Sequence, residues 1–71
     1  MEIFSTRLKE ERKHCGLTQK QLAEKLGIPW HTYRCYESLA TRRSKPSYEM
    51  LVKIAIILNT TTDYLLGKDP V

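Results

Sequence analysis

Apolar residues recur at helical spacing along the chain, and no segment alternates apolar and polar residues as a half-buried strand would. The clearest pattern lies in 19–26, where Leu22, Ala23 and Leu26 share one helical face. Gly27 follows where the chain must turn, because glycine adopts the left-handed conformation without steric cost. The pattern predicts a short helix with a small residue, Ala23, where a second helix can pack closely.

The starts of this helix and of the next one carry different signals. Thr18 and Gln21 form a capping-box pattern, in which the threonine hydroxyl accepts from the Gln21 amide and the glutamine side chain reaches back. The next helix follows Ile28 and Pro29, which offer no side-chain acceptor for its first amides. A phosphate oxygen could accept hydrogen bonds from those amides.

The second helix of the pair is predicted from Pro29 or Trp30 to about Ser38, since proline is well suited to a first helical turn. Tyr33 and Tyr36 lie three apart and form its inward stripe. The two predicted helices are therefore joined by one tight turn.

Further helices are predicted on both sides of this pair. A first helix is predicted to be capped by Ser5 or Thr6 and to run to about Cys15. Its inward-facing residues are Phe4, Leu8 and Arg12. Its solvent-facing residues are Arg7, Lys9, Glu10, Glu11 and Lys13. Residues 39–46 form a basic loop, which Pro46 keeps from being helical. Two more helices, 48–58 and 62–66, are capped by Ser47 and Thr61, and 68–71 is expected to fray.

Composition narrows the class of protein. A chain of 71 residues forms one domain, 1–71, with no room for a catalytic cleft plus a scaffold, which argues against an enzyme. No apolar run could cross a bilayer, and the N-terminus lacks the apolar stretch of a signal peptide, so we expect a cytoplasmic protein without a membrane partner. The net charge of +4 favours a polyanionic partner.

Reactive side chains form no recognisable site. Cys15, Cys35, His14 and His31 lack the paired spacing of metal ligands, and a reducing compartment keeps the cysteines as thiols. There is no nucleophile–base pair and no glycine-rich phosphate loop. We therefore expect no metal, no cofactor and no small-molecule ligand.

Four stretches in register, RLKEERKHCGLTQKQLAEKLGI, TYRCYE, KPSYEMLVKIAIILN and TTDYLLG, resemble the Cro/phage-repressor type helix-turn-helix DNA-binding family over residues 4–67. The resemblance implies an all-α, compact five-helix bundle of the lambda-repressor-like type, with the helix-turn-helix formed by its second and third helices. It also implies a transcriptional regulator, a repressor by expectation, that binds an inverted-repeat operator in double-stranded DNA as a homodimer. Exposed apolar residues around Ile57, Tyr64 and Leu66 are the candidate dimer surface.

By the same resemblance, residues 29–38 form the recognition helix in the major groove. The candidate phosphate-binding residues are Thr18, Gln19, Thr32, Arg42, Arg43 and Lys45. The candidate base-reading residues are Pro29, Trp30, His31, Arg34 and Cys35. The family pairs an arginine of the first helix with the glutamate that ends the third, which implies an ion pair between Arg12 and Glu37.

Two positions depart from the family pattern and leave alternatives open. Pro29 stands where the family has serine or threonine, and Tyr33 where it has a small β-branched residue. Trp30 could instead pack in the core or in a dimer, and the Thr32 hydroxyl could equally bond its own backbone. Because tryptophan is enriched at interaction hot spots, the same surface would also suit a protein-interaction module, such as an antitoxin-like or anti-repressor domain.

Overall fold

The structure is a computed structural model that describes residues 2–38 and 45–68. These ranges form five helices and contain no strand, so the predicted all-α five-helix fold is confirmed. The helices are α1 (Glu2–His14), α2 (Gln19–Leu26), α3 (Trp30–Glu37), α4 (Tyr48–Ile57) and α5 (Thr62–Leu66). The basic segment with Arg42 and Arg43 lies outside the described residues, and so do residues 69–71 of the end expected to fray, 68–71. The amide of Lys68, which is described, donates to the Asp63 carbonyl oxygen at 2.8 Å.

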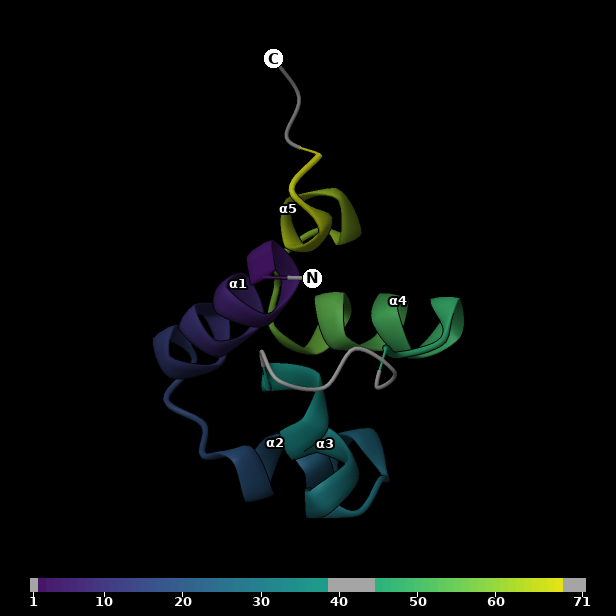
Figure 1. The fold of residues 1–71 in the computed structure, drawn as a ribbon. Coiled ribbons are helices and arrows are strands. Elements are labelled where there is room, and N and C mark those ends of the chain that lie inside the picture. Colours follow the sequence, from purple (N-terminus) through teal and green to yellow (C-terminus); the bar gives the residue numbers. More distant parts are fainter. Residues whose placement is uncertain (1, 39–44, 69–71) are drawn as a thin grey trace.

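The helices are arranged with α2 and α3 together at one end of the molecule and α5 at the other, while α1 and α4 lie between them (Figure 1). Helix α3 contacts both α2 and α1, and α2 also contacts α4. The helix pair is thus held from two sides, with its remaining surface open. Among the described helices, none has the length and apolar character needed to cross a bilayer.

The local signals that delimit the helix pair are confirmed. The Thr18 hydroxyl accepts from the Gln21 amide at 3.1 Å, and the Thr18 amide donates to Gln21 Oε1 at 2.8 Å. Gly27 ends α2 with a φ of 73°, in the left-handed region. Pro29 precedes α3 and gives it no side-chain cap, as expected.

The predicted start of the first helix is wrong. Helix α1 already begins at Glu2, so neither Ser5 nor Thr6 is its cap. Ser5 is instead buried, and its hydroxyl donates to the Tyr36 carbonyl oxygen at 3.1 Å. Arg7 also does not face solvent as expected, because its guanidinium donates to the Tyr64 carbonyl at 2.6 Å and lies over the Tyr64 ring. In both cases a tertiary contact replaces the predicted local role.

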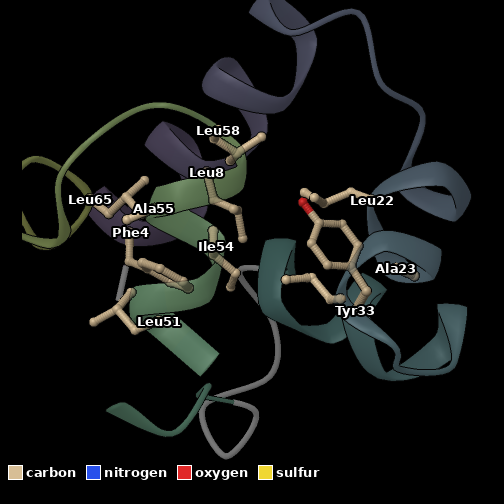
Figure 2. Close-up of a cluster of buried hydrophobic side chains, with 11 residues drawn as sticks. Phe4, Leu8, Leu22, Ala23, Tyr33, Leu51, Ile54, Ala55, Leu58 and Leu65 are labelled. Atoms are coloured by element: carbon tan, nitrogen blue, oxygen red, sulfur yellow. The ribbon is translucent and has the colours of Figure 1, made fainter. Parts of the chain in front are cut away.

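The core joins all five helices. Figure 2 shows Leu22, Ala23 and Tyr33 on one side of this cluster and Phe4 and Leu65 on the other. Ala23 is buried, as the close approach of two short helices requires, and the bulky Tyr33 is fully buried beside it. The rest of the core is Leu8, Leu26, Leu51, Ile54, Ala55 and Leu58.

The apolar residues late in the chain are distributed differently from the prediction. Ile57, Tyr64 and Leu66 were expected to be exposed, but each is partly buried. Ile57 and Leu66 pack against the core, and Arg7 covers the Tyr64 ring. The exposed apolar side chain of this region is Ile56, which is 72% exposed.

Candidate functional site

Helix α3 has one face in the core and one face in solvent. Tyr33 is fully buried, whereas Trp30, His31 and Arg34 are exposed. Thr32 and Cys35 are half-buried, and Pro29, just before the helix, is exposed. The residues proposed from the sequence as base-reading therefore gather around the start and the outer side of one short helix.

The last residue of α3, Glu37, is the centre of a buried polar cluster. Arg12 Nε donates to Glu37 Oε2 at 2.7 Å and Arg12 Nη2 donates to Oε1 at 3.3 Å, so the expected ion pair is present. The Tyr33 hydroxyl also donates to Oε2, and Gln19 Nε2 donates to Oε1 at 3.0 Å. The carboxylate thus accepts two hydrogen bonds on each oxygen, while its side chain is only 3% exposed.

The charges of this cluster are set by its hydrogen bonds. Burial alone would raise the pKa of the Glu37 carboxyl, but the bonds from Arg12, Tyr33 and Gln19 outweigh burial and lower that pKa. The hydrogen bond to Glu37 raises the pKa of Arg12. Burial, together with the bond to the carboxylate, raises the pKa of the Tyr33 hydroxyl. At neutral pH the cluster is a carboxylate, a guanidinium and a neutral phenol, which lets the phenol act as donor.

Arg12 and Gln19 connect this cluster to the neighbouring segments. Arg12 Nη1 donates to the Leu17 carbonyl oxygen at 2.7 Å, so the same side chain also holds the turn between α1 and α2. Gln19, at the start of α2, accepts from the Trp30 indole N–H at 3.2 Å through its Oε1. The Gln19 amide therefore links buried Glu37 to exposed Trp30.

Two cationic side chains lie over the Trp30 ring. Lys20 Nζ of α2 is 5.1 Å from the centroid of the indole ring, and the Arg34 guanidinium carbon is 5.0 Å from it. Both distances are within the range of cation–π attraction. The exposed surface of the helix pair is accordingly an aromatic ring flanked by positive charge.

An open hollow adjoins the start of α2. It is bordered by the end of α1, the following turn and Trp30, and its lining residues are Arg12, Lys13, Gly16, Leu17, Thr18, Gln19, Lys20 and Trp30. The first amides of a helix have no intrahelical partner and attract anions. A hollow that combines this helix start with Lys13 and Lys20 has the charge and the donors to receive a phosphate.

The remaining candidates are dispersed. Lys45 is exposed and borders an apolar pocket with Phe4, Pro46, Leu51 and Leu66. Cys15 is exposed and Cys35 half-buried, and neither forms a disulfide. Within the described ranges no three histidine, cysteine or acidic side chains are grouped as metal ligands would be.

Two residues of the site are not among the candidates predicted from the sequence. Helical periodicity predicts Tyr33 as a core residue alone, although it lies one helical turn before Glu37, a spacing that favours the hydroxyl–carboxylate contact. Lys20 is not predicted, because its position over Trp30 depends on how α2 packs against α3. No pattern along the chain marks that contact.

The sequence of the chain is similar to those of known proteins. A family model described as helix-turn-helix matches residues 8–65. The HTH-type transcriptional regulator ImmR of Bacillus subtilis is 45% identical over 65 residues, which make up 92% of this chain and 49% of that protein. The cryptic phage CTXphi transcriptional repressor RstR of Vibrio cholerae is 40% identical over 62 residues, 87% of this chain and 53% of that protein.

A second Bacillus subtilis protein, the uncharacterized HTH-type transcriptional regulator YqaE, is 45% identical over 64 residues, 90% of this chain and 53% of its own length. The chain thus spans about half the length of the curated relatives it matches. No solved structure matches the chain.

Proposed function

The chain belongs to the helix-turn-helix family of non-enzymatic, DNA-binding transcriptional regulators, and from this premise we propose that it reads a specific duplex sequence with α3 in the major groove. The observation that carries the proposal is the division of α3 between a buried Tyr33 and an exposed outer face with His31 and Arg34. An α-helix fits the major groove only if one whole side of it is free of the protein core.

The exposed side chains have the donors that base reading needs. Arg34 can donate two hydrogen bonds to the O6 and N7 atoms of a guanine, and His31 can donate to or accept from a base edge. Cys35 and Pro29 offer small apolar surfaces that suit a thymine methyl group. In this proposal they specify the sequence, with Arg34 as the main determinant.

Phosphate contacts would hold the helix in register. The start of α2, with the Thr18 and Gln19 backbone and the Lys13 and Lys20 side chains, is one contact region, and Thr32 is a second. Because the Gln19 side chain already bonds Glu37 and Trp30, we assign its phosphate contact to its backbone N–H. The basic segment is proposed as a third contact, through Arg42, Arg43 and Lys45.

The assembly and the direction of regulation are also proposals. We propose a homodimer on an inverted repeat, with half-sites one helical turn, roughly 34–36 Å, apart. The relative RstR is named a transcriptional repressor, which supports repression here. The exposed Trp30 would also suit contact with a protein partner. A failure of the chain to bind any duplex specifically would favour this alternative function, a protein-interaction module.

Selection from a randomised duplex library, followed by fluorescence anisotropy on the selected and a scrambled duplex, tests the proposal. We expect the selected duplex to bind at least about 100-fold more tightly, and both affinities to fall steeply with salt as counterions are released. Arg34→Ala should relax the preference at one base pair at a cost of roughly 1–3 kcal/mol. Lys68→Ala, which removes an exposed positive charge next to α5, is the matched control. Equal affinity for both duplexes would contradict sequence-specific binding.

A further inference from the structure

Trp30 is the first residue of α3 and remains 40% exposed in the folded chain. A large aromatic ring at this point of a groove-facing helix would be expected either to touch bases or to be covered by protein. Instead, the cationic groups of Lys20 and Arg34 lie over it at 5.1 and 5.0 Å. The ring thus has partners within the chain on the surface proposed to meet DNA.

Hydrogen bonds connect the Trp30 ring to a buried residue, Glu37, and so fix its position. The indole N–H donates to Gln19 Oε1, and Gln19 Nε2 donates to the buried Glu37 carboxylate. Only one orientation of the Gln19 amide satisfies both bonds, since the reversed amide would set two donors against each other and two acceptors against each other. Glu37 itself is held by Arg12. A continuous path of hydrogen bonds therefore runs from the ion pair to the ring.

Lys20 and Arg34 come from different helices and carry the same charge, so they repel each other across the surface. The negative face of an aromatic ring attracts both, which offsets that repulsion and restricts the two long side chains. Side chains that are ordered before binding lose less conformational entropy when they bind. The ring is in the right place to order both cations before they meet DNA.

We propose that Trp30 is a positioning residue that holds Arg34 toward the base edges and Lys20 toward the phosphate backbone, and that it does not read a base itself. This inference rests on the proposed DNA-binding function and refines its set of base-reading residues. It implies that the effect of Trp30 on DNA affinity passes through Lys20 and Arg34.

A mutant cycle tests whether Trp30 affects DNA affinity through Lys20 and Arg34. It is measured on the duplex that the unsubstituted chain selects. Trp30→Leu should weaken binding about fivefold to tenfold, as expected for the loss of two ordered cations. In a Lys20→Ala/Arg34→Ala background at low salt, roughly 50 mM, the same change should alter affinity by less than about twofold. An equal factor in both backgrounds, or no effect in the parent, would overturn the proposal.

Two further measurements separate positioning from direct contact and from misfolding. Trp30→Phe retains an aromatic face without the indole N–H, so it should bind more tightly than Trp30→Leu; weaker binding would refute the role of the ring. Selection repeated with Trp30→Leu should blur the base preference of Arg34 and leave the others unchanged. Loss of a preference that Arg34→Ala retains would show that Trp30 reads a base.

The outcome also distinguishes this inference from the proposed function. If the unsubstituted chain binds its selected duplex more tightly than a scrambled one while Trp30→Leu has the same effect with and without Lys20 and Arg34, only the positioning role of Trp30 is contradicted. If the unsubstituted chain binds both duplexes equally, sequence-specific DNA binding is contradicted, and the positioning role with it. Lys68→Ala should leave the affinity within about twofold of the parent, so a larger loss would mean that charge, and not position, governs binding.

Discussion

The two ends of α3 differ sharply in how their side chains are held. At the C-terminal end, Glu37 is almost fully buried and accepts four hydrogen bonds from Arg12, Tyr33 and Gln19. At the N-terminal end, Trp30 is exposed and interacts with two exposed cationic side chains, Lys20 and Arg34. A buried charge must keep all its partners, whereas exposed cation–π contacts are weak and easily exchanged. One end of the helix therefore stabilises the fold, and the other is available to a ligand.

The largest expected effect is at the buried end. Glu37→Ala should lower the free energy of unfolding by about 3–5 kcal/mol, because it leaves Arg12 buried without its carboxylate. That is a large part of the stability of a domain of this size. Glu24→Ala, which removes an exposed carboxylate from α2, should change it by less than about 0.5 kcal/mol. Urea denaturation at neutral pH measures the unfolding free energy of both variants, and similar losses would mean that the buried Glu37 carboxylate stabilises the fold no more than an exposed one does.

Tyr33→Phe should have a smaller effect of the same kind. The ring still fills its place beside Ala23, but the carboxylate of Glu37 loses one of its donors. The expected loss is about 1–3 kcal/mol of unfolding free energy. Tyr48→Phe removes a hydroxyl from an exposed ring, and thermal unfolding should leave that control unchanged. A parent-like Tyr33→Phe would mean that this hydroxyl does not contribute to stability.

Acid should remove part of the same stabilisation. The pKa of Glu37 is lower in the folded chain than its ordinary value of about 4.3, so its contribution is complete above that pH. The contribution is lost as pH falls below about 4.3 toward the folded pKa. Glu37→Gln cannot titrate, so the stability difference between the parent and this variant should be constant near neutrality and shrink in acid. A difference that did not change with pH would show that the charge of Glu37 is not the stabilising feature.

Gln19 connects the two ends and should affect both. Because the Gln19 side-chain amide donates to the buried Glu37 carboxylate, we expect Gln19→Leu to cost roughly 1 kcal/mol of unfolding free energy in addition to DNA affinity. Gln21→Leu affects only the local capping box and serves for comparison. Calorimetry measures the stability of both variants, and their DNA affinities are measured alongside. Parent-like stability and affinity of Gln19→Leu would contradict the role of the link from Glu37 to Trp30.

The smallest effect on stability should be at the exposed end. Trp30→Leu removes two surface cation–π contacts and one exposed hydrogen bond, for an expected loss of less than about 1 kcal/mol. Its effect on DNA affinity should be the larger one. A melting temperature as low as that of Glu37→Ala would mean that both ends of α3 act as structural anchors.

Much of the fold could be predicted because its signals are local. The Thr18 capping box, the turn at Gly27 and the caps at Ser47 and Thr61 each depend on residues three or four positions apart. The inward faces follow from helical periodicity, which requires no knowledge of the partner helix. The local signal failed where it competed with tertiary packing. Ser5 was predicted to cap the first helix, but it lies inside α1, and its hydroxyl donates to the Tyr36 carbonyl of α3.

The sequence by itself determined the five helices, the family and the outward-facing candidates on residues 29–38. Only the tertiary structure decided what those side chains contact. The placement of Lys20 over Trp30, and of the Gln19 amide between Trp30 and Glu37, joins residues of different helices. Such contacts depend on the packing of α2 against α3 and on side-chain rotamers. The periodicity of the sequence does not encode either of them.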